Sequence, residues 1–228
     1  MAELTVAQLA ERLQIGARYA RSLAETGALS ARQLPSGDWL VDSDAVARYA
    51  LRRRTAGRRL DADTAWALLY ELSGIAASAL LPPATYARVR KRIRTMTAED
   101  IAVAVADRTR QQRYRAANGT MAQAGLIGTG RVAADLIAGD LLPDARRVAG
   151  YVPPGSSLEE YARTHFMVAD PSGTDVLYEN TAPGRGYTEP LPAVVAADLA
   201  LSTDTRERSA GLDALTGLKD AWLASRTR

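Results

Sequence analysis

Residues 5–49 constrain the fold more than any other stretch of this sequence. They predict a first helix that Thr5 can cap and whose apolar side chains recur every three or four residues, at Val6, Leu9, Ala10 and Leu13. We expect Ile15-Gly16 to break this helix, because glycine readily adopts the backbone angles of a tight helix–helix turn. A second helix is then predicted from Ala17 to Thr26, with a C-terminal signal at Gly27.

The second helix is predicted to have one apolar and one polar face. Its inward side chains are small or aliphatic: Ala20, Leu23 and Ala24. Its outward side chains are polar, charged or aromatic: Arg18, Tyr19, Arg21 and Ser22. The outward group is therefore free to contact a partner.

Two short extended runs follow the second helix, around the turn Pro35-Ser-Gly37. Asp42 or Ser43 can cap a third helix. Its expected inward residues are Ala45, Val46 and Tyr49. Two helices, a turn, a two-stranded wing and a third helix, in this order, predict a winged helix-turn-helix.

Three segments, Leu4–Gly16, Arg21–Gly27 and Pro35–Trp39, resemble the excisionase/MerR-type helix-turn-helix. In that family the second helix enters the major groove of double-stranded DNA and the wing contacts the adjacent backbone. The resemblance implies these DNA-binding residues: Arg18, Tyr19, Arg21 and Ser22 on the helix, with Arg32 and Gln33 on the wing. The alternative is a degenerate motif that only dimerises or packs.

Positive charge is concentrated in the half of the chain that carries this motif. The net charge is +4 over residues 1–60, +3 over 61–115 and −4 over 116–228. The run 52–59 contains five arginines, of which Arg52, Arg53 and Arg54 are predicted to lie along DNA; the alternative is a solvated linker. Basic residues at 88–94 and 108–115 can extend a DNA surface, meet an acidic partner or face solvent.

Residues 61–228 predict a second, mixed α/β part. Together with residues 1–60, taken as the DNA-binding domain with its basic arm, they make an α+β protein of two domains. Trp66, Leu69 and Leu72 are expected in the core of a helix over 64–72. Further helices are expected at 84–94, 101–106, 131–137, 193–201 and 205–225, and strands at 108–115, 151–152, 167–169 and 175–178.

A second resemblance covers roughly residues 80–225. Tyr86–Arg94, Gly125–Gly130, Asp175–Tyr178 and above all Val194–Arg208 look like the C-terminal region of AbiEi-type antitoxins and related regulators. In those proteins an N-terminal winged domain represses the operon, and the partner is a nucleotidyltransferase-like toxin. The resemblance implies an autoregulating repressor that binds an operator. The alternatives are a protein-interaction module that neutralises its partner without specific DNA binding, and a ligand-sensing regulator.

Other function classes are disfavoured by what the sequence lacks. It has no cysteine and a single histidine, His165, which excludes thiolate catalysis and a histidine-rich metal site. The glycines at 125, 128 and 130 do not match a nucleotide-binding fingerprint, and the acids lack metal-binding spacing. We therefore expect a non-enzymatic, cytoplasmic protein without cofactor or membrane span, acting as a homodimer or a monomer.

Overall fold

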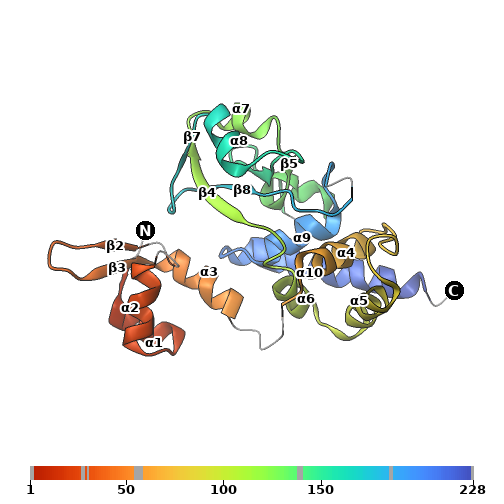
Figure 1. Cartoon of the computed structure of the whole chain (residues 1–228), viewed down its shortest axis with the longest axis horizontal. Coiled ribbons are helices and arrows are strands. Elements are labelled where there is room, and N and C mark those ends of the chain that lie inside the picture. The colour runs from red at the N-terminus through yellow and green to blue at the C-terminus, as the bar shows by residue number, and fades with distance from the viewer. Residues whose placement is uncertain are drawn as a thin grey trace. The chain divides into compact units, whose positions relative to one another are not determined.

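The computed structural model describes residues 3–26, 29, 31–53, 59–137, 141–184 and 187–226, apart from the side chains of residues 44, 48 and 51–53. The chain forms two compact units, Met1–Ala56 and Gly57–Arg228, called here the N-terminal and C-terminal units. Both units combine helices with a sheet, which confirms the α+β fold class (Figure 1). Leu60, predicted in the first domain, lies in the core of the C-terminal unit.

The N-terminal unit contains three helices and a small antiparallel sheet. Its elements are β1 (Glu3–Thr5), α1 (Val6–Leu13), α2 (Ala17–Glu25), β2 (Ala31–Gln33), β3 (Trp39–Asp42) and α3 (Ser43–Arg53). The strand order is β1-β3-β2, so the predicted two-stranded wing is a three-stranded sheet with β3 at its centre. The predicted inward residues Ala20, Leu23 and Ala24 are buried in a common core with Leu9 and Val41.

The end of α1 differs from the sequence prediction. Gln14, rather than a glycine, takes the left-handed conformation, with φ of 52°, and its N–H donates to the carbonyls of Ala10 and Glu11. Gly16 has φ of −68° and ψ of 145°, which any residue can adopt. The turn therefore does not use the conformational freedom of Gly16, and a non-glycine residue carries the strain instead.

Five helices of the C-terminal unit enclose its larger core: α4 (Ala62–Leu72), α5 (Pro83–Thr95), α6 (Ala98–Ala104), α9 (Pro192–Ala200) and α10 (Thr205–Ala224). Every residue of α4 from Thr64 onward is buried, including Trp66, Leu69 and Leu72 as predicted. Helices α9 and α10 approach closely at Gly211. A Cβ at that position would lie 2.3 Å from Ala200 N and 2.6 Å from Ala196 O, so this packing requires glycine.

The C-terminal unit also contains a five-stranded sheet with the order β5-β6-β8-β4-β7. The strands are β4 (Gln111–Ala116), β5 (Ile127–Gly128), β6 (Ala149–Tyr151), β7 (Met167–Ala169) and β8 (Asp175–Tyr178). Only β6 and β8 are parallel within this order. Helices α7 (Gly119–Gln123) and α8 (Leu158–Thr164) cover one face, and the 3₁₀ helix η1 (Gly130–Leu136) and α9 lie on the other (Figure 1).

Strands β7 and β8 were predicted around a turn at residues 170–173, yet they do not pair with each other. Both pair with β4, which lies between them. The turn passes so close to β4 that a Cβ on Gly173 would lie 2.1 Å from Tyr114 O. The turn at Gly173 thus connects two strands across a third one, and β7 becomes the edge of the sheet.

Candidate nucleic-acid interface

Helix α2 is held in place by the helix before it and by its own apolar face. Thr5 and Gln8 form a capping box that starts α1: the Thr5 N–H donates to Gln8 Oε1 at 2.9 Å, and the Gln8 N–H donates to Thr5 Oγ1 at 3.3 Å. Leu23 and Ala24 of α2 then pack into the core that α1 lines. The core thereby fixes which side of α2 faces outward.

The outward face of α2 carries two arginines that the fold leaves unpaired. Arg18, Tyr19 and Arg21 are exposed and Ser22 is half-buried, as the sequence predicted for a contact face. Within the described residues, neither Arg18 nor Arg21 forms a hydrogen bond or an ion pair. The two guanidinium groups therefore remain free to bind an anion or the edge of a base.

The N-terminus of α2 adds to the positive character of this face. Its N-cap residue is Gly16, which offers no side chain to accept a hydrogen bond from the first turn. The first backbone N–H groups of a helix have no partner inside the helix, and they carry partial positive charge. With Arg18 in the first turn, this end of α2 suits a phosphate.

Tyr19 has a structural partner as well as an exposed ring. Its side chain is 49% exposed, and its hydroxyl lies 3.1 Å from the hydroxyl of Tyr49 on α3. This hydrogen bond ties α2 to α3. Tyr19 therefore both braces the helix and presents an aromatic ring beside Arg18 and Arg21.

Arg32 and Gln33 on the predicted wing are engaged within the unit. Arg32 Nε and Nη2 donate to the two carboxylate oxygens of Glu3, each at 2.8 Å, across the sheet. This pair lowers the pKa of Glu3 and raises the pKa of Arg32, mainly through the side-chain hydrogen bond. Gln33 Nε2 donates to Gly37 O at 3.1 Å and closes the turn between β2 and β3. Arg32 would have to leave Glu3 to bind a phosphate.

The arginine run after α3 is only partly described. Arg52 and Arg53 lie in the last turn of α3, whereas Arg54 and the glycine predicted to end the second helix, Gly27, fall outside the described residues. At the other end of the run, Arg59 forms an ion pair with Asp107 of the C-terminal unit. Arg59 therefore contributes to the structure of the C-terminal unit.

Arg108 is buried, unlike the exposed strand residue that the sequence suggested. Strand β4 begins at Gln111, and the Arg108 side chain is 1% exposed. Its Nη2 donates to Asp198 Oδ1 at 2.5 Å and to the Tyr151 hydroxyl, and Asp198 Oδ2 also accepts from Thr129 at 2.6 Å. Burial lowers the pKa of Arg108, but the nearby Asp198 outweighs it and the net shift is upward. The side chain is charged but enclosed, so it cannot contact DNA.

The other basic residues around β4 also have partners within the unit. Arg110 contacts Glu159 at 2.8 Å and Glu179 at 3.3 Å, and Arg115 contacts Asp170 at 2.8 Å. Arg113 Nη1 donates to Gly173 O at 2.7 Å. These contacts leave the 108–115 segment without an unpaired arginine among its described residues, which argues against its use as a DNA surface.

The basic residues of α5 are less strongly engaged. Arg88 reaches Thr85 at 2.9 Å on its own helix, and Arg90 and Arg94 lie over the rings of Tyr86 and Trp222. Lys91 is exposed and, among the described residues, has no polar partner from its side chain. Cations near the C-terminus of a helix interact favourably with the helix dipole. The arginines in the last turn of α5 therefore stabilise the helix whether or not a ligand binds.

His165 lies at the end of a helix and has a structural role. It is the C-cap residue of α8, its ring stacks on Tyr161 with centroids 4.0 Å apart, and its Nδ1 lies 2.9 Å from Tyr161 O. The described residues contain no group of three or more His, Asp or Glu side chains placed to hold a metal ion. Nor does any helix within the described ranges have both the length and the apolar character to cross a membrane.

Comparison with models of protein families, with curated proteins and with solved structures found no match for this chain. A function for the N-terminal unit therefore has to be inferred from its own residues. The relevant features are the unpaired arginines of α2, the uncapped start of that helix and the turn between β2 and β3.

Proposed function

We propose that the N-terminal unit is a winged helix-turn-helix that binds double-stranded DNA, and that the protein is a sequence-specific transcriptional repressor. Helix α2 enters the major groove, and the β2–β3 turn contacts the adjacent backbone. The protein as a whole is proposed to be the autoregulating antitoxin of a toxin–antitoxin pair, as its resemblance to AbiEi-type antitoxins implies.

One observation carries the DNA-binding proposal. Helix α2 buries Ala20, Leu23 and Ala24 and leaves Arg18 and Arg21 exposed and unpaired among the described residues. An unpaired arginine can donate two hydrogen bonds to a guanine in the major groove, or bind a phosphate. The two unpaired guanidinium groups add no ion pair or hydrogen bond to the stability of the folded unit, and this supports a role in binding.

The proposed contacts differ in kind. Arg21 and Ser22 lie further along the exposed face of α2 and are proposed to read base edges. Arg18, at the helix start, and Arg52 to Arg54 are proposed to contact phosphates, which carry no sequence information. Tyr19 positions α2 through Tyr49, and Arg32 and Gln33 shape the wing. Loss of a base contact should therefore change specificity, and loss of a phosphate contact should weaken all binding alike.

The test is a salt-titrated binding assay of the full-length protein on the DNA upstream of its own gene and on a scrambled control. A specific repressor should prefer its own DNA by about a hundredfold or more and show a steep salt slope. Equal, weak binding to both DNAs would contradict the proposal.

Two variants and a matched control sharpen this assay. Arg21→Ala should cost about 1–3 kcal/mol on the native sequence and relax the preference over scrambled DNA. The triple change of Arg52, Arg53 and Arg54 to Ala should weaken binding to both DNAs and flatten the salt slope. Arg146→Ala removes one charge from a side chain that is 98% exposed in the C-terminal unit, and it should bind as wild type. Unchanged affinity of the α2 variant would refute its role.

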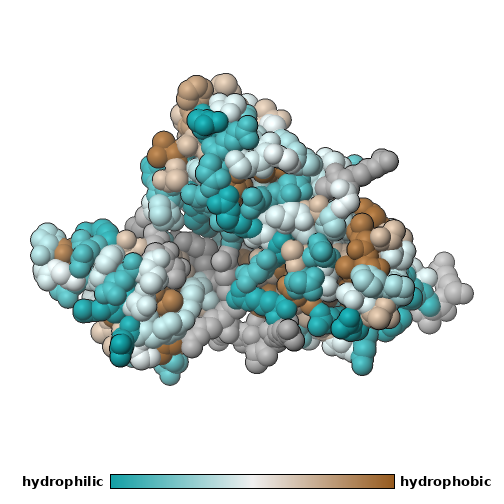
Figure 2. Space-filling model, in the orientation of Figure 1, coloured by the Kyte–Doolittle hydropathy of each residue, from teal (hydrophilic) through white to brown (hydrophobic). Residues whose placement is uncertain are grey.

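Partner binding by the C-terminal unit has its own support at the sheet edge. Phe166 and Val168 flank the start of edge strand β7 and are 71% and 70% exposed, and Figure 2 shows hydrophobic surface over β7. Exposed edge strands and apolar patches are common contact surfaces for other proteins. We propose that this edge contacts the nucleotidyltransferase-like toxin.

Co-expression with the product of the adjacent gene tests the toxin contact. The wild-type chain should co-purify with it in a stoichiometric complex, and Val168→Asp should lose the partner. Leu142→Asp, at another apolar side chain that is 75% exposed, is the matched control and should retain it. Retention by both variants would rule out the edge of β7 as the contact.

A further inference from the structure

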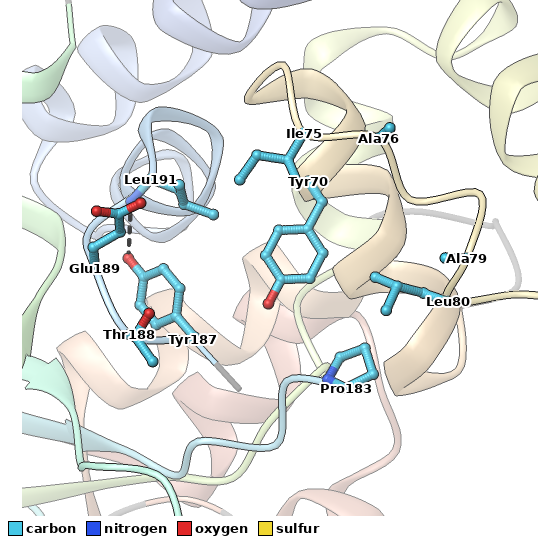
Figure 3. A pocket seen from close by; sticks show the side chains of 10 residues that line it. All are labelled: Tyr70, Ile75, Ala76, Ala79, Leu80, Pro183, Tyr187, Thr188, Glu189 and Leu191. Carbon is cyan, nitrogen blue, oxygen red and sulfur yellow. Dashed lines mark hydrogen bonds between the residues drawn. The ribbon is translucent and has the colours of Figure 1, made fainter. Parts of the chain in front are cut away.

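The C-terminal unit contains an open hollow of about 260 Å³ between three segments of the chain. The last turns of α4 form one wall, the loop that joins α4 to α5 forms the second, and Pro183 together with residues 187–191 forms the third (Figure 3). Its volume lies just below the roughly 300–1,000 Å³ of sites for drug-sized ligands. The hollow therefore suits a small molecule.

Most of the wall is apolar. Ile75, Leu80, Pro183 and Leu191 supply aliphatic surface, and Ile75 is 41% exposed although its side chain is large and hydrophobic. Figure 2 shows a hydrophobic patch over the loop between α4 and α5. Covering this surface with a ligand would remove apolar area from water, which favours binding.

Three polar side chains in the same wall are available to a ligand. Within the described residues, the side chains of Tyr70, Thr188 and Glu189 form no hydrogen bond or ion pair, whereas the Tyr187 hydroxyl accepts from the Leu191 N–H at 3.1 Å. Tyr70 is only 7% exposed, and its hydroxyl points into the hollow (Figure 3). The Tyr70 hydroxyl is not among the buried polar atoms without a partner in the described part of the chain, so it meets solvent in the hollow and is available to a ligand.

The charges and donors in the wall define the ligand. Burial raises the pKa of Tyr70, so its phenol remains protonated and can donate or accept one hydrogen bond. Glu189 is the one charged side chain that lines the hollow among the described residues, and it is negative. An apolar floor, a phenol and a carboxylate together favour a molecule with an apolar body and a positive head group.

We propose that this hollow is a binding site for a small apolar amine, with the apolar body against Ile75, Leu80 and Pro183 and the ammonium beside Glu189. The proposal does not depend on the function of the N-terminal unit, because it concerns binding alone. If the protein is also a repressor, such an amine is a candidate effector.

Trp66 provides a local reporter of occupancy. Its ring centroid lies 6.0 Å from that of Tyr70 and 5.5 Å from that of Tyr187, so ligand binding should shift its indole N–H resonance. Trp39 belongs to the N-terminal unit and Trp222 to α10, and both serve as internal controls. Single changes of Trp39 and Trp222 to Phe assign the three resonances.

The experiment is an NMR titration of the ¹⁵N-labelled full-length protein at pH 7 with three probes that share a phenylethyl group. These are 2-phenylethylamine, the neutral 2-phenylethanol and the anionic 3-phenylpropionate. The amine should bind with a Kd on the order of 1 mM and shift the Trp66 resonance. The alcohol should bind about threefold to fivefold more weakly, as expected for loss of an exposed ion pair, and the acid more weakly still.

Two variants test the assignment of the site. Glu189→Gln should remove the advantage of the amine over the alcohol and leave the alcohol unchanged. Ala79→Trp, at an exposed position on the rim, should fill the hollow and abolish binding of all three probes. The proposal fails if no probe shifts the Trp66 resonance at a probe concentration about ten times the expected Kd. It also fails if the alcohol binds as well as the amine, or if both variants bind the probes as the wild type does. None of these outcomes bears on DNA binding.

Discussion

The buried ion pair between Arg108 and Asp198 makes the sharpest stability prediction. Asp198, on α9, accepts hydrogen bonds from Arg108 at 2.5 Å, from Thr129 at 2.6 Å and from the Tyr151 hydroxyl at 3.1 Å. The two side chains of the ion pair are 1% and 4% exposed. Asp198→Asn keeps the size of the side chain and removes its charge, which leaves the Arg108 cation buried without a counter-ion.

The expected cost follows from this geometry. Removing one partner of a buried, hydrogen-bonded ion pair costs about 3–5 kcal/mol, because the remaining charge stays away from water. The other partners of the guanidinium among the described residues are neutral: the Val105 carbonyl, the Tyr151 hydroxyl and the Trp66 ring. Its Nε has no hydrogen-bond partner there, so no other charge compensates the loss. Against a total stability of about 5–15 kcal/mol, this is a large fraction, and the Tm should fall by roughly 10 °C.

Urea unfolding followed by circular dichroism and by tryptophan fluorescence measures this cost. Glu159→Gln is the matched control, because it removes a carboxylate from an arginine pair whose side chains are 49% and 59% exposed. We expect the control to unfold at the wild-type urea concentration. If Asp198→Asn lies within 1 kcal/mol of wild type, the inference that the ion pair anchors this core is wrong.

Three further predictions concern the backbone and the pH dependence of stability. Gly211→Ala should destabilise by about 1–3 kcal/mol because its Cβ would meet the backbone of α9, whereas Gly217→Ala on the same helix meets nothing within 4 Å and should stabilise slightly; urea unfolding distinguishes them. Phe166→Gly should stabilise by about 1 kcal/mol in the same assay, because Phe166 is exposed and has φ of 51°. Burial raises the pKa of Glu71, but hydrogen bonds, led by that from the Ala77 N–H, lower it overall. The charged Glu71 carboxylate therefore stabilises the folded state above the ordinary pKa of 4.5, and this stabilisation is lost as the pH falls below that value. The Glu71→Gln variant should therefore show a flatter loss of stability between about pH 5 and 3 in urea titrations, and equal slopes for variant and wild type would contradict this.

Local signals in the sequence predicted much of the fold. The cap expected at Thr5 is found in the structure, because its side chain accepts a hydrogen bond from the backbone N–H of Gln8, only three residues away. The two faces of α2 also follow directly from helical periodicity, which sorts Arg18 and Arg21 from Ala20 and Leu23. Such features depend on neighbours within one turn of a helix, so the sequence alone is enough to predict them.

Features that depend on distant neighbours were not predictable in this way. Arg108 and Asp198 are 90 residues apart, and nothing in the alternation of residues 108–115 distinguishes a buried cation from an exposed one. The pairing of β7 with β4 likewise depends on how the turn at Gly173 passes Tyr114. Gln14 adopts a positive φ although Gly16, two residues later, could do so at lower cost. The reason is that the Gln14 N–H donates to the Ala10 and Glu11 carbonyls at the end of α1, which fixes the left-handed residue at that position.

The distribution of charge in the folded units bears directly on which unit can bind DNA. Along the sequence, residues 61–115 carry +3 and residues 116–228 carry −4. Folding brings these opposite charges together, through Arg108 with Asp198, Arg110 with Glu159 and Arg115 with Asp170. The cations around β4 are therefore neutralised before any partner binds, whereas the two arginines of α2 have no partner in the part of the chain that the structure describes. Counter-ion release from DNA requires such unpaired cations, so the segment around β4 should contribute little to the salt slope of binding, in contrast to α2 and the arginines that follow α3.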